Sequence, residues 1–289
     1  MDNSGAENHC TIFAICESPL DANMIWVGTD DGNLQLTKDG GKSWSNLSRN
    51  VKGLPLNTWV SSIDASPFDK NTAFVTFDNH AMGDMKPYVY VTRDAGKSWQ
   101  ALATKDIQGY AHKVKQDPVN ADLLFVGTEL GLYMSMDAGK SWIRYSANVP
   151  PVAVRDIQIH PVTHDLILGT HGRGIIIIDD LTPVRSMSKE VLEKEMSFLP
   201  SRPSFLTTGM YGSAFPNGGY AGPNSTEEYV INYYLKNRIL KGEVRLDFYD
   251  DKGNKVGSTP GTKRKGLNQV TWDMRRKPPR VAEGVKLDF

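Results

Sequence analysis

The chain has 289 residues, of which 39% are hydrophobic and 23% charged, and this composition suits a packed core rather than a disordered chain. Lysine plus arginine equals aspartate plus glutamate, at 33 each, so the overall charge gives no reason to expect nucleic-acid binding. No apolar run reaches the length of a membrane span and no signal-peptide pattern opens the sequence, so we predict no membrane insertion.

An eight-residue motif occurs three times in the first half of the chain. Residues 37–44 read TKDGGKSW, residues 92–99 read TRDAGKSW and residues 135–142 read SMDAGKSW. The three aspartates are 55 and then 43 residues apart. Internal repeats of about 40 to 50 residues are typical of propeller blades or solenoids.

A second pattern accompanies the first. An apolar strand ends at a proline and a further apolar strand follows it, in residues 12–29, 60–76, 112–128 and 155–170. Each repeat therefore predicts four antiparallel strands, which is the content of one propeller blade. The fourth repeat ends at residues 175–180 without the eight-residue motif, and we predict that it is the last blade.

The repeated motif itself indicates a structural turn between the third and fourth strands. Its aspartate is expected to accept hydrogen bonds from backbone N–H groups one to three residues ahead, and its glycine permits a positive φ. The serine hydroxyl is expected to satisfy a backbone group, and the tryptophan to insert its ring between adjacent sheets. The residues assigned these roles are Asp39, Gly41, Ser43, Trp44, Asp94, Gly96, Ser98, Trp99, Asp137, Gly139, Ser141 and Trp142.

The rest of the chain is predicted to hold a linker and a second β-domain. A short helix is expected at Ser188–Glu195, with Ser188 as its cap, and a loop over the glycine- and proline-rich residues 211–224. Alternating apolar and polar residues begin near residue 227. We predict an all-β protein, with about four blades of a partial propeller in 1–182, a linker in 183–226 and an incomplete small β-sandwich in 227–289.

The three motifs resemble the Asp-boxes of sialidase-type BNR-repeat proteins. With residues 2–10, 26–32 and 169–174, the chain more closely resembles the bacterial sortilin-like (VPS10-type) propeller proteins, which are often labelled glycosyl hydrolases. This resemblance implies an extracytoplasmic location, a FlgD-like immunoglobulin-like tail and further propeller blades upstream.

A ligand site is expected on the face opposite the Asp-box turns, as in related propellers. The loop at 78–80 and the blade connections at 57–59 and 110–112 should meet there. The candidate catalytic residues are Asp30, Asp31 and Glu129, and the candidate ligand-binding residues are Trp59, Tyr110, His171 and Arg173. Asp30 and Asp31 also fit an ordinary hairpin turn, and Trp59 and Tyr110 also fit packing positions.

Two classes of function remain open at this point. The resemblance favours a non-catalytic binding or scaffold module for a protein, peptide or glycan ligand. The alternative is a glycoside hydrolase, which would need two carboxylates about 5 to 9.5 Å apart, and a third possibility is a fragment that is inactive alone. His160, His164 and His171 surround a turn and lack a metal-binding motif, so we predict neither a metal nor a cofactor.

Overall fold

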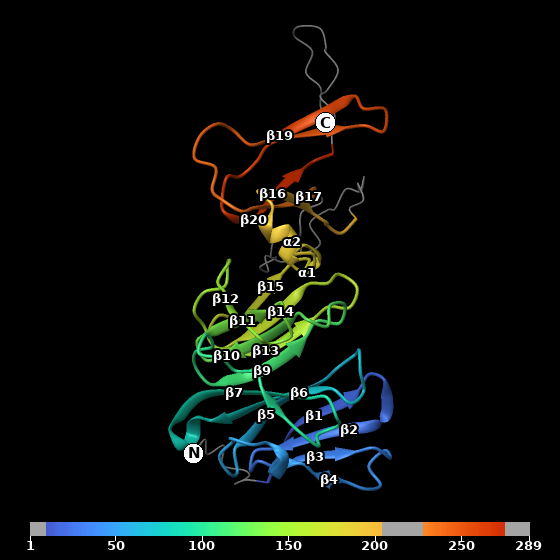
Figure 1. The fold of residues 1–289 in the computed structure, drawn as a ribbon, viewed down its shortest axis with the longest axis vertical. Coiled ribbons are helices and arrows are strands. Elements are labelled where there is room, and N and C mark those ends of the chain that lie inside the picture. The colour runs from blue at the N-terminus through green and yellow to red at the C-terminus, as the bar shows by residue number, and fades with distance from the viewer. Residues whose placement is uncertain (1–9, 204–227, 275–289) are drawn as a thin grey trace, which may run out of the picture. The chain divides into compact units, whose positions relative to one another are not determined.

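The computed structural model describes residues 10–203 and 228–274, and strands dominate both ranges, as predicted for an all-β chain (Figure 1). The chain divides into two compact units, Met1–Asp179 and Asp180–Phe289. The first unit contains the four repeats.

The first unit is a series of antiparallel sheets whose strand order follows the chain. The first sheet contains β1 (Ile12–Ser18), β2 (Asp21–Thr29), β3 (Leu34–Thr37) and β4 (Ser45–Asn46). The second contains β5 (Trp59–Ala65), β6 (Ala73–Asn79), β7 (Asp84–Thr92) and β8 (Gln100–Ala101). The third contains β9 (Ala111–Gln116), β10 (Leu124–Thr128), β11 (Gly131–Ser135) and β12 (Ile143–Tyr145). The fourth contains β13 (Val154–Ile159), β14 (Leu166–Thr170) and β15 (Ile175–Ile178). The prediction of four antiparallel strands for each Asp-box repeat is confirmed.

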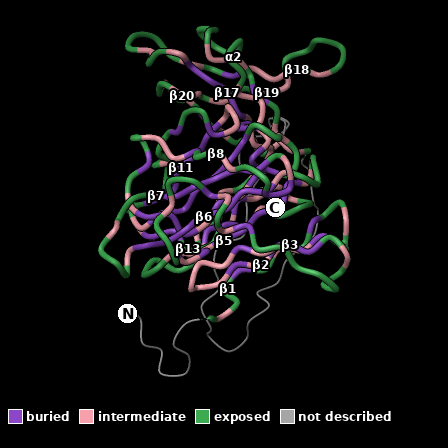
Figure 2. Tube along the Cα trace, turned by 60° about the horizontal axis from the view of Figure 1, so that its bottom comes forward, coloured by how far each residue is buried: buried purple, intermediate pink, exposed green. Residues whose placement is uncertain are grey.

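Alternating side chains let each inner sheet pack on both of its neighbours. In β6, Val75 belongs to the core shared with the first sheet, whereas Phe74 belongs to the core shared with the third. Figure 2 shows buried residues along β5 and β6 and exposed residues in the connecting loops. Burial on both faces explains why β6 is apolar at successive positions, since neither of its faces meets water.

The Asp-box turn is built from side-chain hydrogen bonds that the carboxylate accepts. In the first repeat, Asp39 Oδ1 accepts from Ser43 N at 2.9 Å and Asp39 Oδ2 accepts from Ser43 Oγ at 2.6 Å. The same two bonds recur in the turns of Asp94 and Asp137. Each carboxylate therefore holds its own turn. The backbone N–H of the lysine three residues ahead, Lys42 in the first repeat, also acts on the aspartate, within the predicted range. One predicted detail is wrong, because the serine hydroxyl donates to the carboxylate and not to a backbone group.

The glycine of each Asp-box has the predicted positive φ, at 91° for Gly41, 81° for Gly96 and 86° for Gly139. A second constraint was not apparent in the sequence. A Cβ on Gly96 would lie 2.3 Å from Leu47 Cδ1 of the preceding sheet, so this glycine also permits close approach of two blades.

The expected insertion of the Asp-box tryptophan between sheets holds for two of the three repeats. Trp142 is 4% exposed, and its Nε1 donates to Leu102 O of the preceding sheet at 2.9 Å. Trp99 packs edge-on against Trp26 of the preceding sheet. The prediction is wrong for Trp44, which is 43% exposed and donates to Gly41 O within its own turn. In the described structure, no sheet packs against the side of the first sheet on which Trp44 lies.

The Asp-box aspartates predict a loss of stability in acid. Three hydrogen bonds lower the pKa of Asp39 and Asp94 from 3.8 to about 2. In order of effect, they come from the serine hydroxyl, the serine backbone N–H and the hydroxyl of the threonine two residues before the aspartate. Because folding depresses these pKa values, the stabilisation is present above about pH 4 and is lost as the pH falls towards about 2. The melting temperature should fall between pH 5 and pH 2, and the fall should be shallower in an Asp39→Asn/Asp94→Asn double variant. An equally steep decline in that variant would contradict the assignment.

The described part of the second unit, residues 180–203 and 228–274, contains two small sheets and two short helices. The helices are α1 (Thr182–Arg185) and α2 (Lys189–Glu193), and Ser188 caps α2 by accepting from Val191 N, as predicted. One sheet contains β16 (Met196–Leu199), β17 (Tyr229–Leu235) and β20 (Gly266–Trp272), and the other contains β18 (Arg245–Tyr249) and β19 (Lys255–Pro260). Their core centres on Tyr233, Leu235 and Leu246. The loop expected at 211–224 and the predicted domain's last part, 275–289, lie outside the described residues.

Candidate functional site

Glu129 is the centre of a polar cluster that joins two neighbouring sheets. It lies in the turn between β10 and β11, and its Oε2 accepts from Tyr110 Oη at 3.1 Å and from His112 Nε2 at 3.0 Å, both in the third sheet. Arg155 of β13 in the fourth sheet donates its Nη2 to the same oxygen at 3.2 Å. Three donors on one oxygen fix the carboxylate firmly, because charge-assisted hydrogen bonds are the strong ones.

The backbone places these groups together. Glu129 N donates to Tyr110 O at 3.2 Å, and a register shift between Gly127 and Thr128 brings Thr128 opposite Ala111. A corresponding shift interrupts the pairing of β13 next to Arg155. Bulges of this kind redirect side chains at the ends of strands. Here they bring Glu129 of the third sheet and Arg155 of the fourth within hydrogen-bond distance.

Asp78 extends the cluster to the second sheet. It follows Phe77 near the end of β6, its side chain is 2% exposed, and its Oδ1 accepts from His80 N at 2.9 Å and lies 2.7 Å from His80 Nδ1. Its Oδ2 lies 3.9 Å from His112 Nδ1. The His80 ring is stacked on the Tyr110 ring, with centroids 4.4 Å apart and planes 14° apart. The cluster therefore spans three sheets, and we call Asp78, His80, Tyr110, His112, Glu129 and Arg155 the inter-blade cluster.

The environment shifts the pKa values of three groups in the cluster. Burial alone would raise the pKa of Glu129, but hydrogen bonds from His112 and Tyr110 and the charge of Arg155 outweigh it and hold the pKa below its ordinary value. Burial lowers the pKa of His112, and its hydrogen bond to Glu129 opposes this only in part. Burial, and then the bond to Glu129, raises the pKa of Tyr110. At neutral pH the Glu129 carboxylate is therefore ionised, the His112 imidazole neutral and the Tyr110 phenol protonated.

This arrangement does not suit a general acid at Glu129. A general acid must hold its proton near neutral pH, which requires a raised carboxyl pKa, and that of Glu129 is lowered. Glu129 and Arg155 remain partly exposed, so they present an anion and a cation side by side to solvent. In the described part of the chain, no group of at least three His, Cys, Asp or Glu side chains could hold a metal ion.

Asp30 and Asp31 lie in a separate turn of the first sheet. Asp30 Oδ1 accepts from Thr11 N at 2.9 Å, and Asp31 accepts from Thr29 Oγ1 and, at 3.0 Å, from Asn33 Nδ2. The hydrogen bond from Thr29 lowers the pKa of Asp31 against the opposing effect of burial. Among the described contacts, neither aspartate has a hydrogen-bond partner in common with Glu129.

The other predicted ligand-binding residues lie outside the inter-blade cluster. The Trp59 ring packs edge-on against Phe13, with centroids 4.5 Å apart. His171 donates its backbone N–H to Ala153 O, and Arg173 is exposed in the turn between β14 and β15. Of the candidate catalytic and ligand-binding residues, the structure brings Tyr110 and Glu129 together. The loop at 78–80 and the connection at 110–112, which were expected on the same face, also meet there. Sequence reasoning missed Arg155, although its place at the start of the fourth repeat's first strand corresponds to that of His112 in the third.

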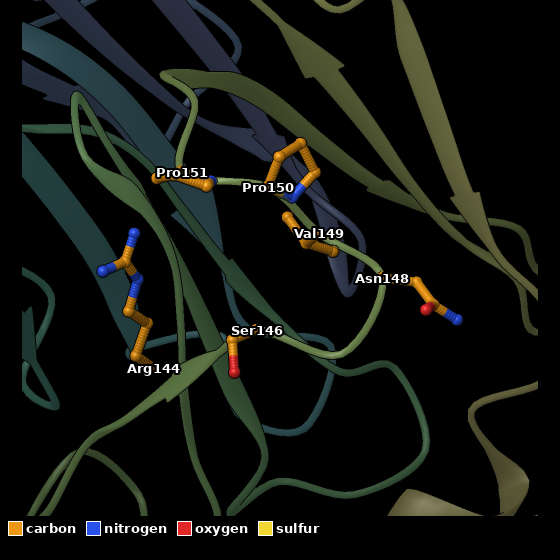
Figure 3. A pocket seen from close by; sticks show the side chains of 6 residues that line it. All are labelled: Arg144, Ser146, Asn148, Val149, Pro150 and Pro151. Carbon is orange, nitrogen blue, oxygen red and sulfur yellow. The ribbon is translucent and has the colours of Figure 1, made fainter.

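The structure also has a shallow pocket elsewhere in the first unit. It has a volume of about 710 Å³ and lies along the connection between β12 and β13, where it is lined by Arg144, Ser146, Asn148, Val149, Pro150 and Pro151 (Figure 3). None of the residues predicted for a site lines it. Within the described ranges, no helix has both the length and the apolarity to cross a bilayer.

Comparisons with known proteins match part of the chain. Residues 87–199 match the Sortilin-Vps10 family model, described as sortilin, neurotensin receptor 3. An oligoxyloglucan-reducing end-specific xyloglucanase of Emericella nidulans is 30% identical over 97 residues, which are 32% of this chain and 10% of the relative. Vacuolar protein sorting/targeting protein 10 of Neosartorya fischeri is 36% identical over 92 residues, which are 32% of this chain and 5% of the relative.

The solved structures similar to this chain include the GH74 xyloglucanase from Xanthomonas campestris. Its identity is 12% and its TM-score 0.49, and the similarity covers 86% of this chain and 36% of that one. The matches to the xyloglucanase of Emericella nidulans and to the sorting protein of Neosartorya fischeri span a tenth or less of the length of those two relatives. The matched segment 87–199 contains Tyr110, His112, Glu129 and Arg155, so the similarity to the Sortilin-Vps10 family model includes most of the inter-blade cluster.

Proposed function

We propose that the chain is a non-catalytic binding or scaffold module of a sortilin-like propeller, and that the loops between blades form its ligand-binding face. The observation that carries the proposal is the inter-blade cluster. Loops and strand ends from three sheets converge there, and three donors hold the Glu129 carboxylate. We further propose an extracytoplasmic location, on the strength of the resemblance to this family.

The chemistry of the cluster defines the ligand in general terms. Glu129 Oε2 is occupied by its three donors, so its other carboxylate oxygen remains to accept from a ligand amide, hydroxyl or ammonium group. Arg155 presents its guanidinium beside it, and the His80–Tyr110 stack adds an aromatic edge. A peptide or a glycan offers this combination of hydrogen-bond donors, acceptors and apolar faces.

A glycoside hydrolase is the alternative that the xyloglucanase relative suggests. Inverting and retaining enzymes both use a general acid whose pKa is raised. The pKa values of Glu129 and Asp31 are both lowered, and the two residues have separate partners. Release of reducing ends from xyloglucan oligosaccharides by the purified chain, abolished by Glu129→Gln, would overturn the proposal in favour of catalysis.

Peptide and glycan arrays with the purified chain test the proposal. The tightest array ligand should lose at least about tenfold in affinity, or about 1.4 kcal/mol, on Glu129→Gln, because the change removes the charge and keeps the shape. Asp247→Asn is the matched control, since Asp247 is also an ion-paired carboxylate, with Arg245 and Lys255, but lies in the second unit. Absence of any array ligand, or equal losses in the two variants, would count against the inter-blade cluster as the binding site.

A further inference from the structure

Glu129 and Arg155 each keep hydrogen-bonding atoms for which the described residues offer no partner. Of the two carboxylate oxygens of Glu129, only Oε2 accepts hydrogen bonds from the described side chains, and of the Arg155 guanidinium only Nη2 donates one. The side chains are 37% and 42% exposed. Glu129 Oε1 therefore remains as an acceptor, and Arg155 Nη1 and Nε remain as donors, in two partly exposed side chains that are already paired.

The pairing of these two side chains restricts the charge that a ligand can carry. Glu129 Oε2 and Arg155 Nη2 are 3.2 Å apart, so a group that binds one side chain also lies close to the other. An ammonium group attracted by Glu129 would be repelled by Arg155, and a carboxylate attracted by Arg155 would be repelled by Glu129. The pair therefore favours an uncharged ligand.

The same atoms define a pattern of hydrogen bonds. A ligand that uses both side chains needs a donor for Glu129 Oε1 next to an acceptor for the Arg155 guanidinium. A single peptide unit has its N–H and C=O on opposite sides of a planar trans bond, so one backbone amide does not serve both. Two hydroxyls on neighbouring carbons of a sugar ring do, because each hydroxyl both donates and accepts. This pattern favours a glycan over a peptide.

His80 provides an aromatic contact beside the pair. Its ring is stacked on Tyr110, whose hydroxyl donates to Glu129, and Asp78 Oδ1 lies 2.7 Å from its Nδ1. The His80 side chain is 33% exposed, whereas Tyr110 is 8% exposed, so the ring available to a ligand is that of His80. Aromatic faces carry partial negative charge and attract the C–H groups of a sugar ring.

We propose that the inter-blade cluster binds a neutral glycan through a vicinal diol, a pair of hydroxyls on neighbouring ring carbons. Glu129 Oε1 accepts from one hydroxyl, Arg155 donates to the other, and the His80 ring packs on the sugar. This inference rests on the binding function proposed above and narrows its ligand to one class of glycan. The three donors on Glu129 Oε2 hold the carboxylate in place before the ligand arrives, which lowers the entropy cost of binding.

Two uncharged oligosaccharides of glucose test the role of the diol. Cellohexaose has a pair of neighbouring ring hydroxyls in every unit, whereas the linkage of laminarihexaose removes this pair from every inner unit. A site that hydrogen-bonds a hydroxyl rejects an analogue that lacks it. Isothermal titration calorimetry on the full chain should therefore show binding of cellohexaose and at least about tenfold weaker binding of laminarihexaose. Periodate oxidation followed by borohydride reduction cleaves the diols without adding charge, and it should abolish the binding of cellohexaose.

Variants of the full chain locate the binding. Glu129→Gln and Arg155→Lys should each weaken cellohexaose binding at least about tenfold, since lysine keeps the charge of arginine but not its planar set of donors. Asp247→Asn should bind as the wild type does, and circular dichroism verifies that each variant is folded. Equal binding of the two oligosaccharides, or no binding of cellohexaose at about 1 mM, would overturn the inference.

The peptide arrays separate the failure of this inference from the failure of the binding function. A peptide that binds and loses affinity in Glu129→Gln, without binding of cellohexaose, would overturn the glycan and leave the binding function in place. Absence of binding to any peptide or glycan would overturn both.

Discussion

Replacing Trp142 with alanine is expected to lower the free energy of unfolding by about 3–5 kcal/mol, the usual cost of removing a large buried aromatic side chain. Trp142 is fully packed in the core between the second and third sheets. The change also leaves Leu102 O without its hydrogen bond from the indole. Urea denaturation followed by circular dichroism measures the loss.

Trp44→Ala is the matched control for this prediction, since both residues end the same sequence motif. Because Trp44 is largely outside any core and bonds only to its own turn, we expect a loss of roughly 1 kcal/mol or less. An equal loss of unfolding free energy in Trp44→Ala and Trp142→Ala would contradict the prediction, because it would mean that the two rings are equally well packed.

Gly127→Ala is expected to destabilise the contact between the third and fourth sheets by about 1–3 kcal/mol through overpacking. The added Cβ would lie 2.4 Å from the carbonyl oxygen of Val154 and 2.9 Å from its Cγ1. A backbone oxygen cannot rotate away as a side chain can, so β13 must move. The loss should appear in denaturant unfolding of the monomer.

The control at the corresponding position is Gly169→Ala. The new Cβ would be in ordinary contact, at 3.4 Å from Asp156 Cβ, and Gly169 does not have a positive φ. Alanine also has less conformational freedom than glycine in the unfolded chain, so stability should stay the same or rise by up to about 1 kcal/mol. A larger loss for Gly169→Ala than for Gly127→Ala would contradict the sheet order described here.

The sequence was sufficient to predict the sheets because each repeat has its own local signals. Alternating apolar strands, the proline after the first strand and the Asp-box turn all act within about 45 residues. The Asp-box of Trp44 shows the limit of such signals. Its eight residues nearly match those ending at Trp99 and Trp142, yet the place of the ring depends on whether another sheet lies beside it.

The site was only partly predictable because it also depends on how neighbouring sheets meet. Blade connections and second loops are expected on one face, and the structure brings Tyr110 and Glu129 together there. Arg155 was missed because its meeting with Glu129 depends on strand irregularities in two different sheets, which the sequence does not mark. Asp30 and Asp31 were grouped with Glu129 by loop type, but local turn bonds hold them within the first sheet.

Hydrogen–deuterium exchange with the tightest ligand from the arrays tests the binding proposal most directly. The account predicts slower exchange on ligand binding in residues 78–80, 110–112 and 129–131 and near Arg155, which lie in three sheets. The Asp-box turns at 39–44, 94–99 and 137–142 should be unaffected. Protection confined to those turns, or to the second unit, would contradict the assignment of the inter-blade cluster as the binding face.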